Sequence, residues 1–158
     1  SLICAALPQL DAMPAAHEYN MPALMDAALA DSLRQHSEAC DSLSHVAGGR
    51  YSLLLPGVNP LRARLLADQI QKTFVRQVGL RNTALANNGP VCALGIACIN
   101  PGTGATAQTL LTQAEDALKN ALSQQSGHIC LAGGASLEER ASLVHSSEKR
   151  FLFFGRNN

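Results

Sequence analysis

The sequence predicts an α/β fold (α+β) in which helices flank a mixed β-sheet. Short apolar runs that are typical of buried strands alternate with longer segments whose apolar residues recur at helical spacing. A glycine pair between two strand-like runs predicts a β-hairpin. The run over residues 91–99 is apolar on both faces, which is typical of an interior strand. Together these observations predict a sheet covered by helices in a ferredoxin-like arrangement.

The first third of the chain predicts a strand, a helix and a hairpin. Residues 2–7 form the strand, and residues 8–21 form a loop or a broken helix because they contain two prolines. Residues 22–35 form a helix that opens on a proline and repeats an apolar residue at every fourth position from Met25. Residues 42–46 and 51–55 form the two hairpin strands.

The rest of the chain predicts three further helices and three further strands. Asn59 and Pro60 open the clearest helix, and a polar loop follows at residues 79–90. The apolar face of this helix is assigned to Leu61, Leu65, Ile70 and Phe74. The opposite face is assigned to Arg62, Arg64, Lys72 and Arg76, as a solvent-exposed surface or a docking face for an acidic partner or a neighbouring domain. The remaining expected elements are a strand at 91–99, a helix at 106–124, a strand at 128–132, a short helix from Ser136 and a strand at 149–154.

Composition excludes several classes of function. The 158 residues are 47% hydrophobic and 15% charged, which excludes a disordered chain and suits one domain. Acidic and basic residues balance, and the chain has no Trp, so we expect no nucleic-acid partner. No apolar run approaches the roughly 20 residues of a membrane span, so we expect no direct membrane contact.

The five cysteines and five histidines predict no metal site. The cysteines form no C-x-x-C pair, and no two histidines stand four residues apart. Four of the cysteines lie in apolar runs, which is typical of reduced, buried thiols in a cytoplasmic protein. We therefore expect a cytoplasmic domain with no metal and no cofactor, either on its own or as the cytoplasmic part of a membrane-anchored protein. No basic segment precedes the first apolar run, so we expect no signal peptide.

Four segments, in order along the chain, resemble the GGDEF domains of bacterial diguanylate cyclases. AGGRYSLLLPG at residues 47–57 resembles the family's signature hairpin, and LLADQI at residues 65–70 follows it on a helix. ALGIA at residues 93–97 resembles a family strand, and LLTQAEDALKNA at residues 110–121 resembles a family helix. The resemblance covers residues 1–132 and implies a nucleotidyl-cyclase-like fold in cyclic-di-GMP signalling.

The residues that carry the family's chemistry are replaced in this chain. Active members hold two metal ions with an aspartate after the first strand and with the acidic third residue of the hairpin motif, because triphosphates need hard cations and those cations need carboxylates. The third hairpin position is Arg50, followed by Tyr51 and Ser52, and the aspartate falls on Pro8 or its neighbour. The other matched positions are Ala16 and His17 for the guanine-reading pair, Asp26 for an acidic residue of the next helix, and Leu122 for a phosphate-binding lysine.

Two further comparisons with the family concern regulation and domain organisation. The inhibitory R-x-x-D site, which binds cyclic-di-GMP, falls on Ala39 and Ser42, so the resemblance implies that the usual product site is absent. LEERASLVHSSEKRFLFF at residues 137–154 resembles the start of an EAL domain. We therefore expect residues 1–132 to form a degenerate GGDEF-like domain. Residues 133–158 form a helix–strand extension, either the start of an EAL domain or the end of this domain's own sheet.

Two functional hypotheses follow from this comparison, and neither is an enzyme. In the first, a catalytically inactive domain relays a signal to a protein partner or to an adjacent EAL or sensor domain, with a homodimer as one arrangement. In the second, the vestigial turn Gly48, Gly49 and Arg50 binds GTP or cyclic-di-GMP without metal, since arginine binds phosphate well. No Ser/His/Asp, Cys/His or paired-carboxylate arrangement supports an unrelated enzyme.

Overall fold

Eight helices and strands follow one another along the part of the chain that the structure describes. The structure is a computed structural model, and it describes residues 1–8, 21–81, 91–99, 102, 104–124 and 128–133. The elements are β1 (Leu2–Ala6), α1 (Met21–Gln35), β2 (Ser42–Ala47), β3 (Arg50–Leu54), α2 (Pro60–Arg81), β4 (Ala93–Ala97), α4 (Ala107–Ser123) and β5 (Ile129–Leu131). Among these elements no helix is both long enough and apolar enough to cross a membrane.

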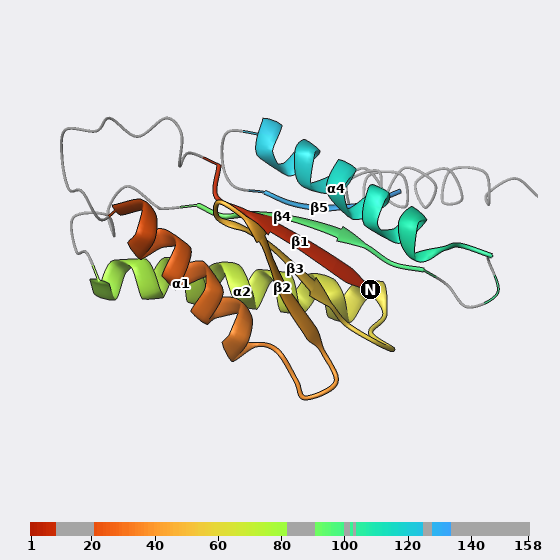
Figure 1. The fold of residues 1–158 in the computed structure, drawn as a ribbon, viewed down its shortest axis with the longest axis horizontal. Coiled ribbons are helices and arrows are strands. Elements are labelled where there is room, and N and C mark those ends of the chain that lie inside the picture. The colour runs from red at the N-terminus through yellow and green to blue at the C-terminus, as the bar shows by residue number, and fades with distance from the viewer. Residues whose placement is uncertain (9–20, 82–90, 100–101, 103, 125–127, 134–158) are drawn as a thin grey trace, which may run out of the picture.

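The five strands form one mixed sheet in the order β2-β3-β1-β4-β5. The pairs β2–β3, β3–β1 and β1–β4 are antiparallel, and β4–β5 is parallel. Figure 1 shows α4 on one face of this sheet and α1 with α2 on the other. The predicted fold class, a mixed sheet flanked by helices, is confirmed, and β4 is an interior strand as its sequence predicts.

Two apolar cores, one on each face of the sheet, explain the continuous apolar runs of β1 and β4. Every residue of these two strands is buried. Ile3, Leu94 and Ile96 face the core under α1 and α2, whereas Leu2 and Cys4 face the core under α4. Because successive side chains of a strand point to opposite faces, a strand between two helical layers needs apolar residues at every position.

Gly95 in β4 sets how closely α4 approaches the sheet. A Cβ atom at this position would lie 2.2 Å from the backbone nitrogen of Leu118 and 2.4 Å from the backbone oxygen of Ala114. Both atoms belong to the backbone of α4, so the absence of a side chain at Gly95 allows the helix to rest directly on the strand. This contact fixes the position of α4 over β1 and β4.

The predicted apolar face of α2 is wrong in its first half. Leu61 and Leu65 are exposed, whereas the buried face includes Ala63, Ala67, Ile70 and Phe74. The reason is geometric: at 3.6 residues per turn, positions nine residues apart, such as Leu61 and Ile70, lie on opposite sides of a helix. The helix also extends to Arg81, so the first three residues of the predicted loop 79–90 are helical.

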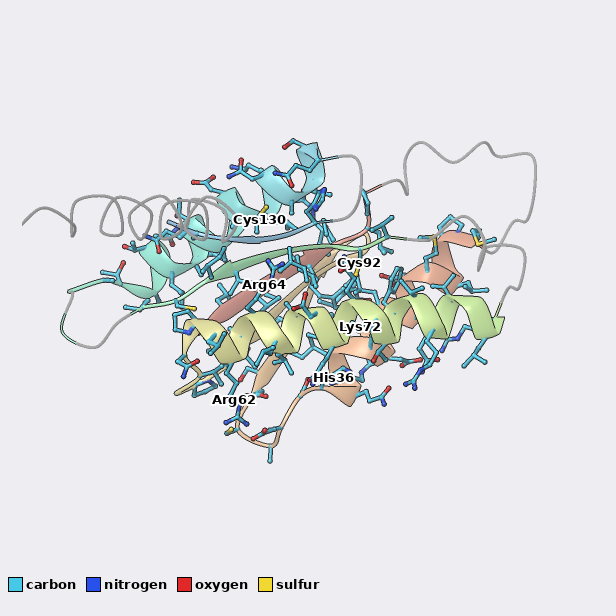
Figure 2. All side chains as sticks on the ribbon, turned by 180° about the vertical axis from the view of Figure 1, so that it is seen from behind. His36, Arg62, Arg64, Lys72, Cys92 and Cys130 are labelled. Carbon is cyan, nitrogen blue, oxygen red and sulfur yellow. The ribbon has the colours of Figure 1, made fainter. Side chains whose placement is uncertain are left out.

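Three of the four basic residues of α2 are exposed, as the predicted basic face requires, whereas Arg64 is half-buried and departs from it. Arg62 pairs with Glu38 at 3.2 Å, on the side of the helix that faces the loop after α1. Arg64 donates to the backbone oxygen of Ile129 in β5 and lies 3.8 Å from Asp68. Figure 2 shows Arg62 and Arg64 on opposite edges of α2. Part of the basic character of α2 is therefore neutralised or used within the domain.

Several predicted features lie outside the described residues. These are most of the loop at 8–21, residues 82–90 of the second loop, the short helix from Ser136 and the strand at 149–154. Apart from the C-terminal end of α2, which extends three residues into the predicted loop, the other predicted helices and strands match described elements to within two residues at each end. All five cysteines are free thiols, of which Cys4 and Cys92 are buried and Cys40 is exposed.

Candidate functional site

The candidate site is the β2–β3 hairpin turn, where the sequence analysis places Gly48, Gly49 and Arg50. Ala47 pairs with Arg50, and the two glycines between them have φ angles of 40° and 73°. These angles lie in the left-handed region, which glycine adopts without steric cost. A Cβ atom on Gly48 would contact no described atom within 4 Å. The turn thus requires both glycines for their backbone conformation, and the space around Gly48 is open.

The end of β1 lies beside this turn. Ala6 of β1 pairs with Arg50 of β3 on one side and with Ala93 of β4 on the other. Pro8 follows two residues after Ala6 and is exposed. The fold therefore brings the two positions that match metal ligands in cyclases, Pro8 and Arg50, to the same end of adjacent strands. Neither side chain carries a carboxylate for a divalent cation.

Arg50 is an exposed cation at this end of the sheet. Its side chain makes no ion pair or hydrogen bond with another residue of the described ranges. Since side chains alternate along a strand, Arg50 shares a face with Ser52, which lies 3.7 Å from the Cys4 thiol, on the α4 side of the sheet. Burial raises the pKa of Cys4, and the charge of Arg50 acts in the opposite direction.

Tyr51, the fourth residue of the hairpin motif, points to the opposite side of the sheet and contacts α1. Its hydroxyl donates a hydrogen bond of 2.9 Å to Oδ1 of Asp26, and its ring lies 4.8 Å from the ring of His45. Burial, reinforced by the hydrogen bond to Asp26 and by that carboxylate's charge, raises the pKa of Tyr51 to about 12. The Asp26 carboxylate, which matches an acidic residue of the family, is thus used to join α1 to the hairpin.

The remaining matched positions do not add charged groups to the turn. Ala39 and Ser42 are exposed around the start of β2, and nearby Asp41 accepts a 2.8 Å hydrogen bond from the backbone N–H of Glu38. Leu122 packs half-buried against the core under α4. Ala16 and His17 lie outside the described residues.

Metal-ligating side chains do not cluster in the part of the chain that the structure describes. No three His, Cys, Asp or Glu residues come together there in a group that could hold a metal ion. The described ranges omit residues 9–20, which follow β1 and contain Asp11, His17 and Glu18. The metal and cofactor predictions therefore stay predictions.

One contact at the site could not be found from the sequence. Tyr51 and Asp26 stand 25 residues apart, and no periodicity or motif within the chain links them. The contact depends on how α1 packs against the sheet, which only the three-dimensional arrangement shows. The same holds for the hydrogen bond of Arg64 to β5, whose partners are 65 residues apart.

Solved structures of other proteins share the fold of this chain. The sequence matches no protein-family model and no curated protein. Among solved structures, the GGDEF domain of YfiN (TpbB) from Pseudomonas aeruginosa superposes with a TM-score of 0.65 at 19% identity, covering 85% of this chain and 82% of that one. A second structure of that domain, truncated at its N-terminus, gives a TM-score of 0.63 at 19% identity over 83% of this chain and 75% of that one.

An EAL/GGDEF domain protein from M. capsulatus is also similar. Its structure gives a TM-score of 0.61 at 19% identity and covers 84% of each chain. The three similarities extend over most of the chain, and the five-stranded sheet with its flanking helices agrees with them. The chain therefore has the fold of a GGDEF domain.

Proposed function

We propose that this chain is a catalytically inactive GGDEF-fold domain that acts as a regulatory or interaction module in cyclic-di-GMP signalling. The observation that carries the proposal is Arg50. It stands at the third position of the hairpin motif, beside the end of β1, and presents an exposed guanidinium where a cyclase needs a metal-binding carboxylate. A fixed positive charge at this position repels a divalent cation.

Two neighbouring features support the same proposal. Pro8, at the end of β1, has no side-chain donor or acceptor. Asp26 accepts a hydrogen bond from Tyr51, so its carboxylate stabilises the packing of α1 on the hairpin. In this proposal residues 1–132 form the domain, which acts in the cytoplasm. Residues 133–158 connect it to a following EAL domain, as in proteins that carry both domains, or to another partner.

A turnover measurement tests the loss of activity. The purified chain is incubated with GTP and Mg²⁺ or Mn²⁺, and the products are separated by chromatography. We expect no cyclic-di-GMP above the level of a heat-treated sample. The same result is expected for Arg50→Glu, because the new carboxylate restores only one of the two missing metal ligands. Formation of cyclic-di-GMP by the unaltered chain would overturn the proposal.

A second candidate function is metal-independent binding of GTP or cyclic-di-GMP at the hairpin turn. The observation that favours it is that Arg50 is exposed and has no charged partner among the described residues, next to two glycines with open space at Gly48. A guanidinium beside free backbone N–H groups is a recognised way to bind phosphate.

Titration calorimetry separates the two functions. Each nucleotide is titrated into the chain with and without Mg²⁺, and the same titrations are made with Arg50→Ala. Arg76→Ala is the matched control, because Arg76 is an exposed arginine on α2. Binding without Mg²⁺ that disappears only in Arg50→Ala supports the sensor. No heat with either nucleotide excludes it and leaves the interaction module.

A further inference from the structure

The outer face of α2 carries a row of exposed apolar residues that the domain does not bury. Of the six large apolar side chains that are exposed in the described ranges, four lie on this helix. Leu61, Leu65 and Val75 are 69%, 55% and 37% exposed, respectively. Figure 2 looks onto α2 with Lys72 labelled in the middle of the helix. A helix with apolar residues on two sides can bury one side within the domain and the other side against a partner.

The spacing of this row is that of a coiled-coil seam. Residues 61, 65, 68, 72, 75 and 79 follow one another at steps of four, three, four, three and four. The six residues of this row are Leu61, Leu65, Asp68, Lys72, Val75 and Gly79. They occupy the d and a positions of successive heptads, and we call them the α2 row. The face opposite the row contains the buried Ala63, Ala67, Ile70 and Phe74.

The charges of the α2 row select one orientation of a partner helix. Consider two antiparallel α2 helices related by a two-fold axis at the level of Ile70. Asp68 of each copy then faces Lys72 of the other copy, so the pair forms twice. In this register Leu65 faces Val75, and Leu61 faces Gly79, which leaves room for the larger side chain. A parallel pair would instead place Asp68 against Asp68 and Lys72 against Lys72.

We propose that a second copy of this chain binds α2 along the α2 row, in the antiparallel sense. The apolar pairs supply the attraction, and the two Asp68–Lys72 pairs fix the register. Asp68 is available for this role, since its contact with Arg64 within the chain is long, at 3.8 Å. Arg62 and Arg76 border the row and approach each other across the dimer, and Glu38 offsets this repulsion by pairing with Arg62.

This inference does not depend on the proposed function. The α2 row lies on a different part of the domain from the hairpin turn. The result of a nucleotide binding or turnover experiment therefore does not test the dimer. The contact is formed by one 22-residue helix from each copy. A single helix pair of this length is a small interface, and we therefore expect a weak, concentration-dependent dimer rather than an obligate one.

Sedimentation velocity over a concentration series tests the dimer. We expect the unaltered chain to shift from monomer to dimer as its concentration rises. Leu65→Gln should weaken the dimer more than tenfold, because the substitution removes an apolar layer on both sides of the axis. Leu80→Gln is the matched control, because Leu80 lies on the same helix, is more exposed at 76%, and falls outside the α2 row. The dimer affinity of this variant should equal that of the unaltered chain.

Charge reversal tests the antiparallel register. Asp68→Lys and Lys72→Asp alone should each weaken the dimer about tenfold, because two attractive pairs become repulsive. The double variant should recover, and an equimolar mixture of the two single variants should form a heterodimer. Circular dichroism checks that each variant remains folded. A chain that stays monomeric at every concentration, a dimer that the reversals leave unchanged, or a mixture that does not associate would each overturn the proposal.

Discussion

Substituting Gly95 tests whether the close contact of α4 with β4 determines the stability of the domain. In Gly95→Ala the new Cβ would lie 2.2 Å from the backbone nitrogen of Leu118, whereas ordinary contacts begin at 3.4 Å. The helix must therefore move away by about 1.2 Å, the difference between these two distances. No side-chain rotation can relieve the overlap, because the atoms that it meets are backbone atoms.

The displacement should loosen the core that α4 forms with the sheet. Overpacking that shifts side chains and backbone costs about 1–3 kcal/mol, and because α4 must shift as a whole we expect a loss at the upper end of this range, about 3 kcal/mol. The corresponding decrease in Tm is roughly 6–12 °C for a chain of this size. Urea unfolding followed by circular dichroism measures the loss of free energy.

Gly57→Ala is the control for the conformational cost of replacing a glycine. Gly57 has a φ of 69° and open space around it, so its substitution strains only the backbone. That cost is about 1–2 kcal/mol. If Gly95→Ala unfolds at the same urea concentration as Gly57→Ala or higher, the reasoning about α4 is refuted.

Two further predictions concern titration and thiol reactivity. Because folding raises the pKa of Tyr51 from 10.0 to about 12, its contribution to stability is complete below pH 10 and is lost as the pH rises toward 12. Urea unfolding at several pH values should show that Tyr51→Phe loses less free energy of unfolding between pH 10 and 12 than the unaltered chain does. Equal losses in the two proteins would contradict the assignment. Burial raises the pKa of Cys92 to about 12, whereas Cys40 is exposed. A thiol-specific reagent at neutral pH should therefore modify Cys40 first, and Cys40→Ser should remove the fastest phase, while fast labelling of Cys92 would contradict its burial.

The elements that the sequence predicts well are those whose burial pattern is unambiguous. β4 is apolar at every position and lies between two helical layers, as expected for such a run. In α1, Met25, Leu29 and Leu33 recur at the predicted spacing, and all three are buried. For these segments, side-chain size and spacing agree about which face is buried.

The buried face of α2 shows where pattern reading fails. The face that packs on the sheet begins with Ala63 and Ala67, whereas the bulkier Leu61 and Leu65 are exposed. An interpretation that gives most weight to large apolar residues places the wrong side of the helix in the core. The exposed leucines are the very residues that the α2 row requires, so the error arises from an amphipathic pattern with two apolar sides.

The positions at which this chain resembles the family and those at which it departs from it differ in burial. The segment ALGIA, which resembles the family, is fully buried, and its glycine cannot gain a side chain without displacing α4. Arg50, Ala39 and Ser42 stand where the family needs charged ligands, and all three are exposed. Exposed positions at a turn tolerate substitution at little cost in stability, whereas buried close contacts do not. Similarity to GGDEF structures at 19% identity therefore reports packing, and the proposed loss of catalysis rests on the residues at the hairpin turn and beside it.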